Sequence, residues 1–286
     1  MARRKSRRRS RGGSPKAIVI IGIVVVGGLA AYLFGPQALQ TWQNQSDSRA
    51  DATDPRPAET LVAGVIVDPS GSNGGTRKAR EALRLLADIM EQWPGTRPTT
   101  QGGIPATAGL DLTVRQISGN SFASNAQIAH VVIPPIPAVP ERPLDTTNPE
   151  ANEQFLIEVE QAQASWDQAF GSATQAAKQL TDAELSGDAS EVAGAISSLA
   201  QVLPRSEQPR RIVIVSDLLQ AGASPQIAGD LTNTVVTAIQ RCDKGAARCQ
   251  EAQQSFTSLV TQLSGPAPTY VRIEALDSAL AAALTP

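Results

Sequence analysis

The chain has 286 residues, of which 41% are hydrophobic and 18% are charged, and its formal net charge is −2. This share of aliphatic residues excludes a disordered chain and is sufficient for a packed core. A single histidine, His130, and two cysteines are too few for a zinc finger or an iron–sulfur site.

The charge is distributed unevenly along the chain. Eight Lys and Arg residues lie within residues 3–16, and no Asp or Glu precedes Asp47. The remainder carries 17 positive and 27 negative charges, a net charge of about −10. Binding to nucleic-acid phosphates requires clustered Lys and Arg, so we expect no nucleic-acid partner for this acidic part.

Residues 17–34, which follow the basic tail 1–16, contain no charged residue. Eighteen helical residues reach about 27 Å, roughly one hydrocarbon core, so we predict a transmembrane helix. A cleaved signal peptide has the same order of charge and apolar residues, but this stretch is longer than the usual apolar region and ends without a clear Ala-x-Ala site. A buried core helix is the third interpretation.

Positive charge before the span and a mixed, acidic segment after it predict a cytoplasmic N-terminus and an extracytoplasmic remainder, periplasmic or extracellular. The basic tail is expected to act as this topology signal; binding to nucleic acid or to anionic lipid headgroups is the alternative for this segment. Residues 35–59 are rich in Gln, Ser, Asp and Pro and are predicted to link the membrane to a domain at 60–286.

From Thr60 the chain alternates strands and helices, which predicts a doubly wound, mostly parallel α/β sheet of the three-layer kind. The run 61–67 is continuously apolar, as in a strand buried on both faces, whereas 110–117 alternates like a half-exposed strand. Strands are expected at 61–67, 110–117, 128–133, 211–215 and 270–275. Helices are expected at 76–93, 149–185, 189–203, 226–241, 246–263 and 277–284. The proline-rich stretch 134–149 and the following helix, to residue 185, are expected to form an insertion.

Polar residues follow two of the predicted strands. The sequence Asp68-Pro69-Ser70-Gly71-Ser72 follows strand 61–67, and Ser216-Asp217 follows strand 211–215. Ligands of such sheets bind beyond the carboxyl ends of the strands, where a carboxylate needs a partner to offset its desolvation. Carboxylates, hydroxyls and waters form an all-oxygen shell that suits Mg²⁺, Mn²⁺ or Ca²⁺.

Asp68, Ser70 and Ser72 match the Asp-x-Ser-x-Ser signature of von Willebrand factor type A domains, and Asp217 matches the later aspartate of that family. The chain resembles this family over about residues 60–276. The resemblance implies a metal-ion-dependent adhesion site, with Ser190 as a further ligand where the family usually has Thr. It also implies a divalent cation, Mg²⁺ first, that binds an acidic side chain of a protein partner.

The chain departs from the family pattern in two places. Pro69 occupies a position that is usually apolar, and its fixed φ alters the loop. Asp188, Thr181 and Thr174 are alternatives to Ser190 as the further ligand. In an alternative interpretation the site has lost its metal, and Asp68 and Ser70 only cap the helix that follows.

We expect no enzymatic activity. The glycine-rich stretch 71–78 lacks the Gly-Lys-Ser/Thr ending of a phosphate-binding loop. Ser72 lacks the preceding glycine of a Gly-x-Ser-x-Gly nucleophile elbow. His130 is expected inside a strand, far in sequence from the polar strand ends.

The chain has two cysteines, Cys242 and Cys249. An even number of cysteines in a compartment that is expected to be oxidising favours a disulfide. In one continuous helix their Cα atoms would be about 10 Å apart, too far to be bridged. Gly245 allows a helix to end and the chain to turn back. Two separate buried thiols are the alternative.

The sequence therefore favours a single-pass, membrane-anchored binding module of the cell envelope that uses a divalent cation to bind a protein. The alternative is a structural subunit of a cell-envelope assembly that uses the same fold without metal.

Overall fold

The computed structural model describes residues 59–70, 74–143, 148–187, 190–204, 209–220, 227–243 and 245–285. The chain divides into two units, Met1–Asp54 and Pro55–Pro286, and all the described residues belong to the second. The predicted basic tail, transmembrane helix and linker lie outside them, except for Glu59, as do Ser72 and Asp188. None of the helices that are described is both long and apolar enough to cross a membrane.

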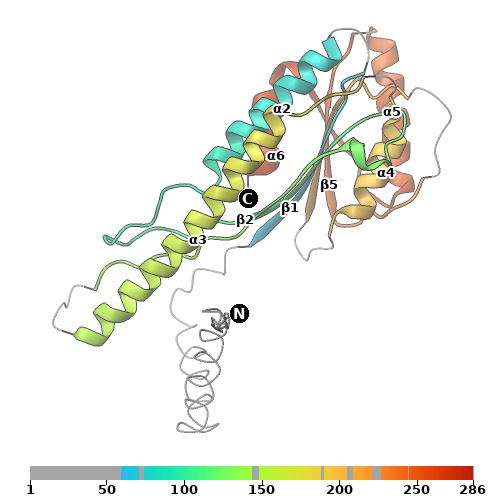
Figure 1. Cartoon of the computed structure of the whole chain (residues 1–286). Helices are drawn as coiled ribbons and strands as arrows, with labels where there is room; N and C mark the ends of the chain where they lie inside the picture. The colour runs from blue at the N-terminus through green and yellow to red at the C-terminus, as the bar shows by residue number, and fades with distance from the viewer. Residues whose placement is uncertain are drawn as a thin grey trace, which may run out of the picture. The chain divides into compact units, whose positions relative to one another are not determined.

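A six-stranded sheet in the order β3-β2-β1-β4-β5-β6 forms the centre of the domain (Figure 1). Its strands are β1 (Thr60–Val67), β2 (Gly109–Gln116), β3 (Gln127–Ile133), β4 (Arg210–Ser216), β5 (Thr234–Gln240) and β6 (Thr269–Arg272). The edge strand β3 pairs antiparallel with β2, and the other four neighbouring pairs in this sheet are parallel. The prediction of a mostly parallel α/β sheet is confirmed.

Helices cover both faces of the sheet and make it the middle of three layers (Figure 1). They are α2 (Gly74–Gln92), α3 (Pro149–Thr181), α4 (Val192–Val202), α5 (Ala246–Gln262) and α6 (Leu276–Leu284), with short 3-10 helices at Ser124–Ala126 and Ile273–Ala275. One hydrophobic core joins α2, α3 and α6 to the sheet, and the other joins α4 and α5 to its opposite face.

Strand β1 shows why a central strand of this sheet is apolar throughout. Val65 and Val67 belong to the core under α2, whereas Val62 and Ile66 belong to the core under α4. Gly64 lets α4 approach the strand, because a Cβ at this position would lie 2.5 Å from Cδ2 of the buried Leu199. Because a helical layer covers each face of the sheet, the side chains on both faces of β1 pack in apolar surroundings.

Two predictions about the sheet are wrong. Residues 226–241 were expected to form a helix, but residues 234–240 form strand β5, paired with β4 and β6. Five of its seven residues are β-branched, which favours a strand. The predicted half-exposed strand 110–117 is buried along nearly all of β2, because helices cover both faces of the sheet at this position as well.

Helix α3 extends beyond the sheet (Figure 1). It begins after Asn148, whose side chain accepts hydrogen bonds from the backbone N–H groups of Glu150 and Ala151 and caps the helix. Its outer part packs on the proline-rich segment in a small third core, made of Val139, Phe155, Val159 and Ala162. Bridges between Ile104 and Val139 and between Thr107 and Ile136 hold that segment beside the loop before β2.

Candidate metal centre

The ends of β1 and β4 bring two polar segments together. The strands are parallel neighbours with Val67 opposite Val215, and the N–H of Asp68 donates to the carbonyl of Val215 at 2.9 Å. Asp68 therefore lies beside Ser216 and Asp217 at the carboxyl edge of the sheet. Sequence reasoning predicted this neighbourhood from the two apolar strands alone.

The carboxylate of Asp68 is buried and accepts three hydrogen bonds. Its Oδ1 accepts from the backbone N–H of Ser70 at 2.9 Å. Its Oδ2 accepts from the hydroxyls of Ser216 at 2.6 Å and of Ser190 at 3.3 Å. These donors satisfy the oxygens of a residue that is only 2% exposed.

Ser190 arrives at the site from a segment that is distant in sequence. Its neighbour Glu191 is held by Ser121, whose N–H donates to Glu191 Oε2 at 3.0 Å and whose hydroxyl donates to the Glu191 carbonyl at 3.2 Å. Of the predicted alternatives, Thr181 donates its hydroxyl to carbonyls of its own helix, α3, and Thr174 is exposed on the same helix. The structure therefore brings Ser190, rather than either threonine, to Asp68.

Asp217 is close to two charged groups, the carboxylate of Asp68 and the guanidinium of Arg241. Its Oδ1 accepts from the N–H of Leu219 at 3.0 Å, and its Oδ2 lies 3.5 Å from Nη2 of Arg241. Burial raises the pKa of Asp217, and the negative charge of Asp68 raises it further, whereas the Leu219 N–H and Arg241 act in the opposite direction. Two carboxylates so placed repel each other, and a cation between them would remove that repulsion.

Arg241 is a residue of the site that sequence reasoning missed. Its guanidinium is buried. Nη2 lies 3.4 Å from the carbonyl oxygen of Ser70, and Nε forms an ion pair with Asp243 at 2.7 Å. The signal that could have found it was present: Arg241 is the first residue after β5, at the same edge as Asp68 and Asp217. The incorrect helix at 226–241 concealed that position.

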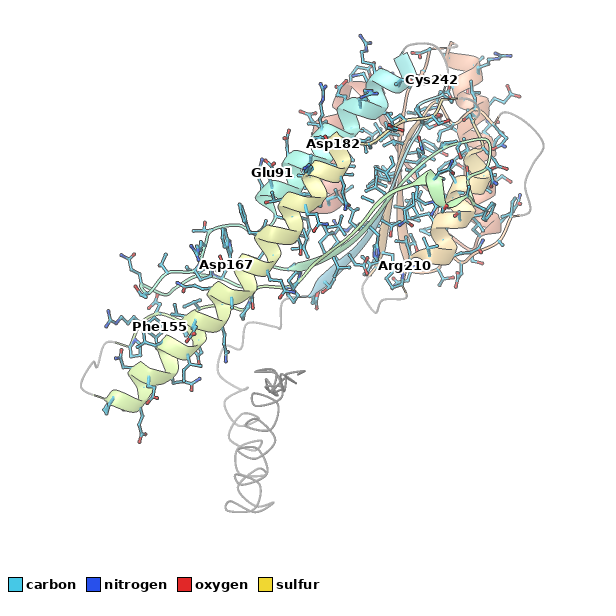
Figure 2. All side chains as sticks on the ribbon, in the orientation of Figure 1. Glu91, Phe155, Asp167, Asp182, Arg210 and Cys242 are labelled. Atoms are coloured by element: carbon cyan, nitrogen blue, oxygen red, sulfur yellow. A yellow bond between two sulfur atoms is a disulfide. The ribbon has the colours of Figure 1, made fainter. Side chains whose placement is uncertain are left out.

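A disulfide between Cys242 and Cys249 closes the loop that follows Arg241, with Cα atoms 5.7 Å apart. Gly245 turns the chain with φ +88° immediately before α5 begins at Ala246. Figure 2 shows Cys242 and Arg210 at opposite ends of the sheet. The bridge thus anchors the chain next to the site to the first turn of α5.

The donor set fits a hard divalent cation. Asp68, Ser70, Ser190 and Asp217 offer only oxygen ligands, and Mg²⁺ is commonly bound through one or two carboxylates while it keeps several waters. No group of three or more His, Cys, Asp or Glu side chains that could hold a metal occurs among the residues described. A cation at this edge would therefore depend on two carboxylates and serine hydroxyls.

His130 lies away from this edge. Its Nε2 is 2.9 Å from Oδ1 of Asp111 on the neighbouring strand β2, and His130 is opposite Thr113, halfway along the β2–β3 pair. The pair is exposed and belongs to the surface of the sheet's antiparallel edge.

Fold and site together define a three-layer α/β domain with a buried cluster of carboxylates and hydroxyls at the carboxyl edge of its central strands. No protein-family model matches the chain, and no curated protein matches it in sequence. Similar solved structures include proximal thread matrix protein 1 from the mussel byssus, with a TM-score of 0.41 and 10% identity over 79% of this chain. Another is an aerotolerance-related membrane protein from Bacteroides fragilis, with a TM-score of 0.33 and 12% identity over 79% of this chain and 96% of its own. The present chain spans about half, 47%, of the mussel protein.

Proposed function

We propose that this chain is a membrane-anchored binding module of the von Willebrand factor type A class that holds a divalent cation, Mg²⁺ first, at the carboxyl edge of its sheet. Asp68, Ser70, Ser190 and Asp217 would hold the cation, together with Ser72, two residues beyond Ser70. The observation that carries the proposal is the convergence of three donors on Asp68 directly beside Asp217. Residues 17–34 anchor the module, and residues 60–286 lie outside the cytoplasm.

The cation would supply an electrophilic centre for an incoming oxygen ligand. Hard cations prefer charged oxygen, so the partner is a protein that offers an Asp or Glu side chain. The chain's own residues hold and orient the cation: the hydroxyls of Ser190 and Ser216 and the backbone N–H of Ser70 fix the direction of the Asp68 carboxylate. Binding, rather than catalysis, is the role proposed, since the histidine pairs with Asp111 away from the site.

Calorimetric titration of the full chain with Mg²⁺, in a neutral detergent, tests the proposal. Wild type should bind one cation, and Asp68→Ala and Asp217→Asn should each abolish binding while the circular dichroism spectrum stays unchanged. Asp277→Asn, an exposed carboxylate on α6, is the matched control and should bind as wild type does. A folded Asp68→Ala variant with wild-type affinity would show that the site is assigned wrongly.

One observation favours the second candidate, a metal-free structural subunit of an envelope assembly. Arg241 already places a positive charge next to Asp217, so the carboxylate has a partner without a metal. In this case wild type would show no heat of Mg²⁺ binding, and partners recovered from an envelope extract would be the same with Mg²⁺ and with EDTA.

A further inference from the structure

The outer face of α2 carries a row of three arginines. Arg77, Arg80 and Arg84 are spaced three and four residues apart, which places them on one side of the helix, and all three are exposed. They line an open cavity of about 750 Å³ together with Thr76, Glu81 and Leu85. We call these three residues the arginine row.

The arginine row begins next to the candidate metal centre. The hydroxyl of Thr76, which precedes Arg77, donates to the carbonyl of Pro69 at 2.9 Å, between Asp68 and Ser70. From there the row runs about 10 Å along the helix. The row therefore starts one residue after a residue that contacts the loop of the site.

The charge of the row is not neutralised locally. Glu81, the acidic residue that lines the same cavity, pairs instead with Lys78 at 2.8 Å. Within the described parts of the chain, no ion pair joins any of the three guanidinium groups. The row is a local basic surface on a domain that is otherwise acidic, and exposed guanidinium groups bind carboxylates in a forked geometry.

We infer that the arginine row is the docking surface for an extended acidic segment of the partner protein. One carboxylate of that segment is the ligand of the cation, and further Asp or Glu side chains pair with Arg80 and Arg84. This inference rests on the proposed function. It adds to that function a partner with several acidic residues in sequence, held by charge complementarity along α2.

Fluorescence anisotropy with two labelled eight-residue peptides tests the inference. Both peptides have a Gly/Ser background; one contains a single Glu and the other four Glu at alternate positions. Full-length wild type in neutral detergent with Mg²⁺ should bind the four-Glu peptide about tenfold more tightly than the single-Glu peptide. Two exposed charge pairs of ordinary strength account for such a gain.

Arg80→Gln/Arg84→Gln should remove most of this gain, with the Mg²⁺ affinity of the site unchanged. Gln has a helix propensity close to that of Arg, so α2 is preserved. Arg142→Gln/Arg272→Gln changes the net charge equally at two exposed residues outside α2 and should keep the gain. The basic tail is present in every variant, so its attraction for the peptides is common to all.

The outcomes separate the inference from the function on which it rests. If the gain persists in Arg80→Gln/Arg84→Gln, or if wild type shows no gain, the arginine row is not the docking surface even when single-Glu binding depends on Mg²⁺. If the Arg80→Gln/Arg84→Gln effect is present but EDTA leaves the binding of both peptides unchanged, the row binds acidic peptides and the cation-dependent function is wrong.

Discussion

Nη2 of Arg241 lies 3.5 Å from Oδ2 of Asp217, so the candidate metal centre already contains a buried positive charge. The same guanidinium reaches the carbonyl of Ser70 and pairs with Asp243. A divalent cation bound to Asp217 would be repelled by this neighbour, and the repulsion is strong where little water screens it. Arg241 would thus oppose metal binding at this site.

Replacing Arg241 by Gln should therefore tighten Mg²⁺ binding by at least about tenfold, equivalent to about 1.4 kcal/mol. Isothermal titration of the full chain measures the change. Arg248→Gln is the control, because Arg248 is exposed on the same small crevice as Asp217 but makes no ion pair among the described residues. Weaker Mg²⁺ binding by Arg241→Gln would show that the guanidinium supports the ligands rather than opposing the metal.

Ser216→Ala should destabilise the domain by about 1–3 kcal/mol, because it leaves the buried Asp68 and the N–H of Leu218 each without one partner. Ser190→Ala removes a longer contact to the same oxygen and should cost about 0.5–1.5 kcal/mol. Urea unfolding in EDTA gives both values. Equal losses of unfolding free energy in Ser216→Ala and Ser190→Ala would contradict the prediction that the shorter hydrogen bond to Asp68 contributes more.

Asp217 should make the domain less stable as the pH rises, when no metal is bound. Its pKa in the folded state is raised above the ordinary value of 3.8, so between that value and the raised one the folded state binds more protons than the unfolded state. Stability must then fall with increasing pH across this window. In EDTA, the difference in unfolding free energy between wild type and Asp217→Asn should decrease from pH 3.8 upward. If this difference instead increases with pH, the lowering of the Asp217 pKa by Arg241 and by the N–H of Leu219 is larger than its raising by burial.

Gly75→Ala should disrupt the loop of the site. A Cβ on Gly75 would lie 1.9 Å from the carbonyl oxygen of Ser70 and 2.9 Å from Nη1 of Arg241, and such overpacking costs about 1–3 kcal/mol. Gly171→Ala, in the middle of α3 with nothing within 4 Å of the new atom, should instead stabilise by about 0.5–1 kcal/mol. Thermal unfolding of both variants checks the opposite signs, and a loss of stability in both would contradict the prediction.

The central strands and their polar ends could be predicted from the sequence because both signals are local. β1 and β4 are continuous apolar runs, and Asp68 and Asp217 follow them directly. β5 could not be distinguished from a helix by periodicity, because Ile227, Leu231, Val235 and Ala238 recur at helical spacing. Only pairing with β4 and β6 decides between the two states, and that pairing is a property of the assembled sheet.

The residues of the candidate metal centre could be predicted only where the ends of the strands were predicted correctly. Asp68, Ser70 and Asp217 followed from strand ends, whereas Ser190 rested on the family resemblance. The hydroxyl of Ser216, which makes the shortest of the contacts to Asp68, was visible only as part of a Ser-Asp pair. Predicting Arg241 required knowing where β5 ends. Because residues 226–241 were expected to form a helix, Arg241 was not predicted to belong to the site.

The direction of β1 places the start of the described domain and the candidate metal centre at opposite ends of this strand. The chain enters the sheet at Thr60 and reaches Asp68 only at the far end of this eight-residue strand, which spans about 26 Å. Anything fused or tethered ahead of Thr60 is thus attached at the opposite edge of the domain from the carboxylates. Immobilising the protein through its N-terminal side should leave that edge free for ligands, which makes it the suitable orientation for a surface-based binding measurement.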